Sequence, residues 1–138
     1  MMPPRAHRRA GGFLLIEVLI AILIFAIGIL GLVGLQARMT KAQTEAKARA
    51  DAVNLAGELR GLMWLDIANL AQYETSACAA HAPCANWLAK LQATLPGGGA
   101  TVTRDATRPG SVSIRINWQL PNGGSRRYET VTVIQGAA

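Results

Sequence analysis

The chain has 138 residues, of which 51% are hydrophobic and only 16% are charged, with 14 Lys and Arg against 8 Asp and Glu. This composition is too apolar for a disordered chain, and the length fits one domain. The apolar residues are concentrated, because residues 13–35 contain a single ionisable side chain, Glu17. An ordinary soluble globular domain over the full length is therefore excluded.

The net charge of +6 is mostly a signal of membrane topology. Three arginines, Arg5, Arg8 and Arg9, precede the apolar stretch, which leaves 11 basic against 8 acidic residues in the rest of the chain. Basic residues that flank a span on its N-terminal side place that side in the cytoplasm. We therefore expect a single pass with the N-terminus in the cytoplasm and the chain from residue 36 onward outside the cytoplasmic membrane.

Residues 13–35 are long enough to cross a membrane, since 23 residues make a helix of about 35 Å and the hydrocarbon core is about 30 Å thick. A cleaved secretory signal has a shorter apolar core than this one. Two adjacent arginines, Arg8 and Arg9, also permit a twin-arginine signal, and hydropathy alone favours a plain anchor. A plain anchor has no reason to carry Glu17, because a carboxylate at mid-bilayer costs about 2.5–3.5 kcal/mol.

Residues 12–23 read GFLLIEVLIAIL, which resembles the class III prepilin signal of type IV pilins and type II secretion pseudopilins. The resemblance implies that a prepilin peptidase cuts between Gly12 and Phe13, and that the new amine of Phe13 is methylated. It also implies that Glu17 accepts the amine of a neighbouring subunit during assembly. Leu14 departs from the pattern, in which threonine is commonest, but it keeps the helix apolar.

Elementary electrostatics agrees with this role of Glu17. A free α-amine has a pKa of about 8 and is charged at neutral pH. The cut therefore creates a cation that can neutralise Glu17, in a medium where the pairing is far stronger than in water. Such a buried pair also fixes the register of one helix against the next.

The run IGILGLVGLQ at residues 27–36 resembles PilV-type minor pilins, also called type IV pilus modification proteins. This resemblance implies a role in pilus assembly and initiation, contacts with other minor and major pilins, and residence in the pilus after assembly. A type II secretion minor pseudopilin is the alternative. Gly28, Gly31 and Gly34 are expected to allow close helix packing or local flexibility, unless they only face lipid.

Residues 36–70 are expected to continue the helix as an amphipathic spine, because good helix formers dominate and no proline occurs. A helical hairpin or a coiled coil is the alternative. The apolar positions that recur at three- and four-residue steps predict the face that packs on the rest of the protein: Met39, Ala42, Ala46, Ala50, Val53, Leu59, Leu62 and Met63.

Residues 71–138 form the predicted periplasmic head. Cys78 and Cys84 are expected to form a disulfide in this oxidising compartment, worth about 2–2.5 kcal/mol for so short a loop. A metal site with His81 is the alternative, but structural zinc requires four ligands. We expect His81 to be exposed in the loop and no cofactor to be bound.

A short helix is predicted at residues 87–95, capped by Asn86, and is followed by a predicted antiparallel sheet of three or four strands. The strands are expected at residues 100–104, 111–119 and 126–135, with a hairpin turn at 122–124. The predicted fold is α+β, a long N-terminal helix packed on a small antiparallel sheet. This outline is the one that pilins and pseudopilins show.

The sequence also bears on two other classes of function. An enzyme is disfavoured, because His7 and His81 are the only histidines and no Ser/His/Asp set or carboxylate pair stands out. A membrane-anchored module that binds DNA or an anionic surface is the second alternative, although strand arginines are usually solvated. Its candidate residues are Arg104, Arg108, Arg115, Arg126 and Arg127.

Overall fold

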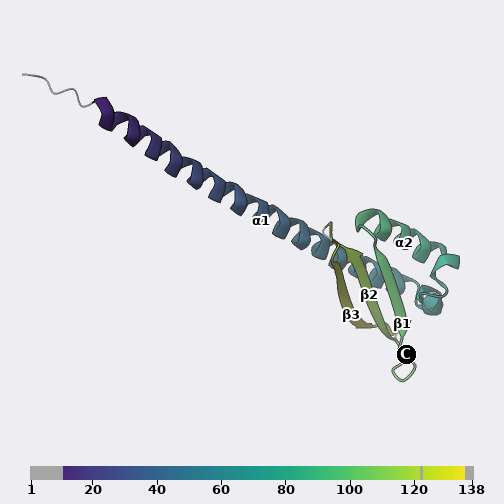
Figure 1. Ribbon diagram of the computed structural model, residues 1–138. Coiled ribbons are helices and arrows are strands. Elements are labelled where there is room, and N and C mark those ends of the chain that lie inside the picture. Colours follow the sequence, from purple (N-terminus) through teal and green to yellow (C-terminus); the bar gives the residue numbers. More distant parts are fainter. Residues whose placement is uncertain (1–10, 122, 136–138) are drawn as a thin grey trace, which may run out of the picture. The chain divides into compact units, whose positions relative to one another are not determined.

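A computed structural model describes residues 11–121 and 123–135 of the chain. The chain divides into two compact units, Met1–Ala42 and Gln43–Ala138. Its class is α+β, as the sequence predicts (Figure 1). The elements in order are α1 (Gly11–Leu65), the 3-10 helices η1 (Ile67–Tyr73) and η2 (Cys78–Ala80), α2 (Ala82–Thr94), β1 (Gly99–Arg104), β2 (Ser111–Gln119) and β3 (Ser125–Val133).

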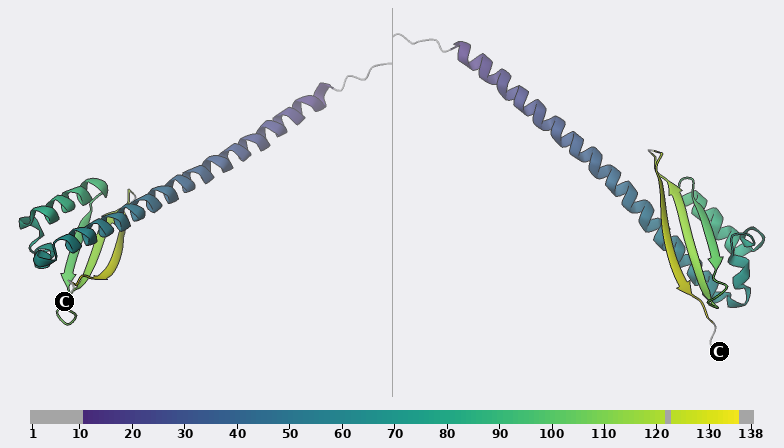
Figure 2. Two further views of the ribbon diagram at one scale, coloured as in Figure 1. Left: turned by 180° about the vertical axis from the view of Figure 1, so that it is seen from behind. Right: turned by 60° about the horizontal axis from the view of Figure 1, so that its bottom comes forward.

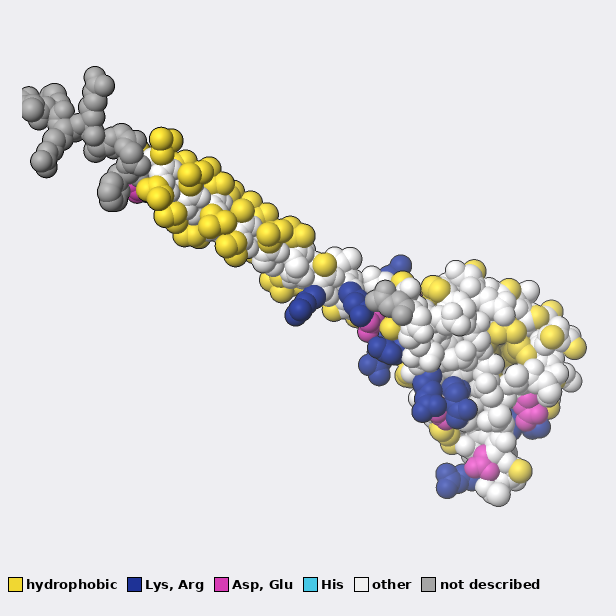
Figure 3. All heavy atoms as spheres, in the orientation of Figure 1, with side chains coloured by type: hydrophobic (Ala, Val, Ile, Leu, Met, Phe, Trp, Pro, Cys, Tyr) yellow, Lys and Arg dark blue, Asp and Glu magenta, His cyan; other side chains and the backbone are white. Residues whose placement is uncertain are grey.

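The first unit contains the N-terminal part of α1, and hydrophobic side chains cover most of the face of this segment that Figure 3 shows. Between Leu14 and Leu35 every large hydrophobic side chain is at least 45% exposed. The most apolar 18-residue window of α1 has a mean hydropathy of 3.1, and none of it is buried. This segment has the length and composition of a membrane-crossing helix. Of the expected leader, residues 1–10 lie outside the described residues, and the helix already begins at Gly11.

The second unit is built on a three-stranded antiparallel sheet in the order β1-β2-β3 (Figure 2). Central strand β2 alternates as predicted, so that Ile114, Ile116 and Trp118 are buried on one face while Arg115 and Asn117 are exposed on the other. The last part of α1 packs on the buried face, and α2 adds Trp87 and Leu91 to the same core.

The face that α1 buries differs from the predicted one. Ala46, Ala50 and Val53 are exposed, whereas Leu59, Leu62 and Met63 do face the core. The predicted stripe changes sides of the helix at its gap near residue 56, and alanine is small enough to suit either side. The residues of α1 that pack in the core follow a single line: Ala48, Ala52, Leu55, Ala56, Leu59, Leu62 and Met63.

Two helix boundaries also differ. Helix α1 ends at Leu65 rather than at residue 70, because Asp66 has non-helical backbone angles (φ −130°, ψ 48°). Helix α2 begins at Ala82 rather than at residue 87, so Asn86 lies inside it and does not cap it. Pro83 stands in its first turn, where a missing N–H leaves no helical bond unmade.

Candidate functional site

The predicted processing and assembly residues lie at the start of α1. Gly12 and Phe13 are in its first turn, and side chains are described from Leu14 onward. Glu17 is exposed on the helix surface, and the helical neighbours Leu14, Ile20 and Ala21 are all apolar. Glu17 is thus a single carboxylate on a surface that otherwise suits hydrocarbon.

Glu17 has no cation to pair with in the described part of the chain. The five ion pairs found there all lie in the second unit, and none includes Glu17. The first basic residue after Glu17 is Arg38, well beyond the apolar stretch. A carboxylate on a membrane-spanning surface is costly without a partner. Chemically, this position is suited to receive a cation that is brought to it.

The glycines of the apolar segment have open space around them within the described chain. A Cβ placed on Gly28, Gly31 or Gly34 would meet no atom within 4 Å. Nothing inside the described chain therefore requires glycine at these positions. Because these glycines recur at every third residue, they drift around the helix and do not line one side of it.

A second feature of α1 was missed by sequence reasoning, namely an uncharged face of small residues on the outside of the second unit. Its residues recur at three- and four-residue steps and are exposed, and Ala46, Val53 and Gly57 border the sheet, where they line shallow pockets with residues of β2 and β3. A Cβ on Gly57 or Gly61 would meet no atom within 4 Å, and Trp64 is 46% exposed. We call this the small-residue face: Ala46, Ala50, Val53, Gly57, Gly61 and Trp64. The G-x-x-x-G spacing of its two glycines was a signal available in the sequence.

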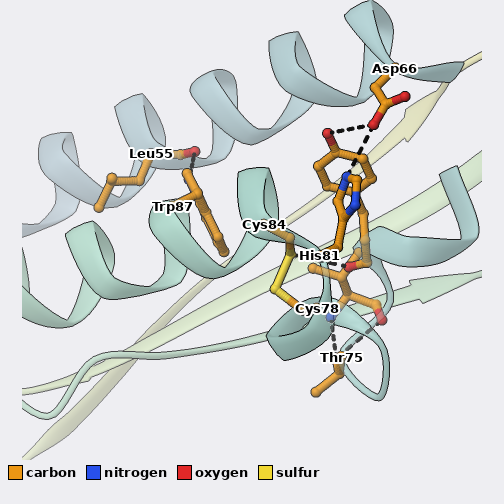
Figure 4. Close-up of a disulfide and its surroundings, with 9 residues drawn as sticks. Leu55, Asp66, Thr75, Cys78, His81, Cys84 and Trp87 are labelled. Carbon is orange, nitrogen blue, oxygen red and sulfur yellow. Dashed lines mark hydrogen bonds and ion pairs between the residues drawn. A yellow bond between two sulfur atoms is a disulfide. The ribbon is translucent and has the colours of Figure 1, made fainter. Parts of the chain in front are cut away.

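A cluster of polar side-chain contacts around Asp66 joins the end of α1 to the segment that follows (Figure 4). Its Oδ2 accepts a hydrogen bond from the Tyr73 hydroxyl at 3.3 Å and lies 3.0 Å from Nε2 of His81. Its Oδ1 accepts a hydrogen bond from the Asn69 amide at 2.7 Å. The Tyr73 and His81 rings meet edge to face, with centroids 4.8 Å apart. His81 is therefore not the exposed loop residue that the sequence predicts.

Burial raises the pKa of the Tyr73 hydroxyl, and the nearby Asp66 carboxylate raises it further. Both effects oppose the formation of a tyrosinate beside an existing negative charge. Tyr73 therefore stays neutral and donates a hydrogen bond to Asp66 throughout the physiological pH range.

Cys78 and Cys84 form the predicted disulfide, which closes the loop that carries His81. Cys84 is fully buried and Cys78 is 6% exposed, so the bridge is part of the core. Because both sulfur atoms are bonded to each other, they are not thiolate ligands for the metal site considered as the alternative. Beside the bridge, Trp87 donates a hydrogen bond from Nε1 to the Leu55 carbonyl oxygen at 2.9 Å, which joins α2 to α1.

Three of the five arginines considered for a DNA-binding surface are paired with acidic residues. Arg115 makes two hydrogen bonds to the Glu129 carboxylate, which lowers the pKa of Glu129 and raises that of Arg115. Arg104 donates to Glu74 at 2.7 Å, a contact from β1 to the loop after η1. The third pair joins Arg126 to Glu45 at 3.7 Å. These contacts neutralise much of the positive surface.

Neither the protein-family models, nor the curated proteins, nor the solved structures contain a match to this chain. The architecture itself is pilin-like. It consists of a long apolar N-terminal helix, a small antiparallel sheet that packs on the later part of that helix, and one disulfide in the C-terminal region.

Proposed function

We propose that this chain is a minor pilin of the type IV pilus, cut by prepilin peptidase between Gly12 and Phe13 and active in pilus assembly and initiation. The observation that carries the proposal is Glu17, a lone carboxylate without an ion-pair partner among the described residues on an exposed apolar helix. The methylated amine of Phe13 from a neighbouring subunit is the cation that we assign to it.

The apolar part of α1 suits both membrane anchoring and assembly. Its large side chains are exposed on all sides, so each subunit can bury this surface first in lipid and then against other helices. When the helix moves from lipid into a helix bundle, its apolar surface stays in apolar surroundings. Helix packing and polar pairing therefore determine whether the helices associate. In this proposal, Glu17 supplies the polar pairing.

The small-residue face supports the same proposal further along α1. Small side chains allow two helix backbones to approach closely, and none of the residues of this face is charged. The partners that we assign to this surface are the helices of other minor and major pilins. The protein would thus reside in the inner membrane with its second unit in the periplasm, and later in the pilus.

Peptide mass spectrometry of the N-terminus tests this proposal, applied to the protein from membranes and from sheared surface fibres of its native host. A chain that begins at methylated Phe13 and is present in the sheared fraction is the expected result. An intact Met1 start, or a cut after Gly28, would overturn it.

The same measurement separates the proposal from a type II secretion minor pseudopilin, which shares the class III signal. A methylated Phe13 start that is found only in the membrane fraction would favour the pseudopilin. A membrane-anchored DNA-binding module would instead keep an unmethylated N-terminus, and its arginine-bearing second unit would shift DNA in a salt-dependent way.

A further inference from the structure

Strand β3 forms one edge of the sheet (Figure 2), and the direction of its backbone groups follows from the strand pairing. Val102 of β1 turns its N–H and C=O away from β2, toward Thr75, and it lies opposite Ile114 of β2. Ile114 therefore turns its backbone groups toward Thr130 of β3, and the direction alternates along each strand. The residues of β3 whose N–H and C=O point away from the sheet are Arg127, Glu129, Val131 and Val133.

The two edges of the sheet differ in their hydrogen bonds. At the β1 edge, the Val102 N–H donates to the Thr75 hydroxyl at 2.7 Å, and the Thr75 N–H donates to the Val102 carbonyl oxygen at 3.1 Å. At the β3 edge, the outward backbone groups have no hydrogen-bond partner within the part of the chain that the structure describes. The residues that carry these groups are all exposed. The β3 edge is therefore open to a further strand, whereas Thr75 closes the middle of the β1 edge.

The second half of β3 lacks the devices that usually protect an edge strand from pairing, which are lysine, proline and β-bulges. Residues 130–134 read TVTVI, without a charge or a proline, and the pairing of β3 with β2 is continuous. Val131 is 64% exposed and Val133 is 54% exposed on the face of the sheet away from α1. Two exposed valines beside unpaired backbone groups favour a surface that another strand covers.

On its other face, β3 borders a groove of about 100 Å³ against α1. A strand added to β3 would direct alternate side chains toward α1, and this groove leaves space beside them. Its lining is formed mostly by small, hydroxyl and aliphatic groups, which suit short side chains. The lining residues from α1 and β3 include Val53, Gly57, Arg60, Tyr128, Thr130 and Thr132.

We propose that β3 binds an extended segment of a different protein, which adds to the sheet as a further strand. Only an extended backbone matches the spacing of the outward N–H and C=O groups, and this pairing supplies the affinity. Side chains supply the specificity. Val131 and Val133 select apolar, β-branched residues opposite them, and Arg127 selects an acidic residue. Glu129 already accepts two hydrogen bonds from Arg115, so a neutral residue fits opposite it.

A second copy of this chain fits the edge less well. Its β1 edge is closed at Val102 by Thr75, so the copies cannot pair β3 with β1 along their full length. A symmetric pair of β3 strands is antiparallel, with a two-fold axis perpendicular to the sheet. That axis reverses the direction of the part of α1 that packs on the sheet. Two copies held in one membrane by the start of the same helix would instead have these segments pointing the same way.

This site goes beyond the proposed function and does not depend on it, because binding of a peptide is a property of the isolated chain. We would test it with the full-length, nitrogen-15-labelled protein in detergent micelles. The probe is the synthetic peptide Gly-Val-Thr-Val-Thr-Ser-Thr-Glu-Gly with blocked ends. In antiparallel register its valines lie opposite Val133 and Val131, and its glutamate lies opposite Arg127. The control peptide is N-methylated at both valines, which removes two donors that would face β3.

Amide hydrogen exchange, measured by NMR, locates the bound strand. At saturating peptide, the amide protons of Val131 and Val133 should exchange about tenfold more slowly or less, because they become hydrogen-bonded. The amides of Thr130 and Thr132 face β2 already and should change little. The N-methylated peptide should protect none of these amides.

Variants of Val131 test the edge without disturbing the hydrogen bonds to β2. Val131→Pro removes one outward N–H, at the kind of position where edge strands tolerate proline. Val131→Lys keeps that N–H and adds a charge among the apolar contacts. Both should weaken binding of the labelled peptide, measured by fluorescence anisotropy, about tenfold or more, whereas Val131→Thr should bind as the parent does. Near-ultraviolet circular dichroism checks that each variant is folded.

The proposal is overturned if the peptide does not bind, or if it binds and leaves the amides of Val131 and Val133 unprotected. It is also overturned if folded Val131→Pro and Val131→Lys bind the peptide as Val131→Thr does. Protection of the same amides that grows with protein concentration, without peptide, would identify a second copy as the occupant and would overturn the assignment to a different protein.

Discussion

Nε2 of His81 lies 3.0 Å from Oδ2 of Asp66, a contact that joins the disulfide loop to the residue that ends α1. The histidine side chain is only 17% exposed and the aspartate 28%. Because a carboxylate only accepts hydrogen bonds, the proton of the imidazole belongs on Nε2. This contact holds the disulfide loop beside the end of α1, and Tyr73 of η1 donates a second hydrogen bond to the same carboxylate oxygen.

Removal of the Asp66 carboxylate should destabilise the second unit. Asp66→Ala leaves the buried Tyr73 hydroxyl without its acceptor, a loss that typically costs about 1–3 kcal/mol. We expect a lower midpoint of chemical unfolding, followed by near-ultraviolet circular dichroism of the full-length protein in detergent micelles. Asp51→Ala, which changes another carboxylate on α1, is the control and should have a small effect. Equal midpoints for Asp66→Ala and the parent would contradict this prediction.

Tyr73 should make the stability of the fold sensitive to alkaline pH. Its pKa in the folded protein is raised above 10.0, so the folded state holds the phenolic proton more tightly than the unfolded state does. The resulting stabilisation is fully present below pH 10.0 and is lost as pH rises through the folded pKa. Tyr73→Phe cannot ionise and should lose less stability over that alkaline range. Parallel alkaline unfolding curves for the parent and Tyr73→Phe would show that this phenol is not responsible.

Two tryptophans of the second unit should differ sharply in their contribution to stability. Trp87→Phe removes the hydrogen bond to the Leu55 carbonyl and leaves space in the core, which together cost about 2 kcal/mol or more. Trp64→Phe is the matched control, because Trp64 is 46% exposed on the small-residue face. Chemical unfolding of both variants measures the difference. If Trp64→Phe were as destabilising as Trp87→Phe, the small-residue face would be part of the core and not an outer surface.

The strands and the apolar helix could be predicted from the sequence, because each has a strong period or an unbroken run of one residue type. Strand β2 alternates through Val112, Ile114, Ile116 and Trp118, and its bounds match the prediction. The buried face of the later part of α1 could not be predicted as well, because its surface is rich in alanine and glycine. Such residues carry little preference for either side, and tertiary packing selects the line through Leu55 and Leu59.

The cluster around Asp66 could not be predicted from the sequence, for a different reason. Its members Asp66, Tyr73 and His81 are spread over sixteen positions of the sequence without a regular spacing. They meet only because α1 ends at Leu65 and two short 3-10 helices fold the chain back. The pocket lined by Glu45, Trp118 and Arg126 is equally non-local, since it combines α1 with β2 and β3. Contacts of this kind follow from the fold and not from local pattern.

Glu17 should be needed for entry into the fibre but not for membrane insertion or processing. Glu17→Gln keeps the size of the side chain and removes its charge, so in the proposed assembly the Phe13 amine of a neighbouring subunit would lose its counter-ion. Breaking a buried pair in this way costs about 3–5 kcal/mol, and we expect the amount in the sheared surface fraction to fall at least tenfold. The membrane fraction should still contain the chain that begins at methylated Phe13. Glu58→Gln is the control, because the Glu58–Lys90 pair is exposed and contributes little to stability. If Glu17→Gln were recovered normally in the sheared fraction, this carboxylate would not be needed for assembly.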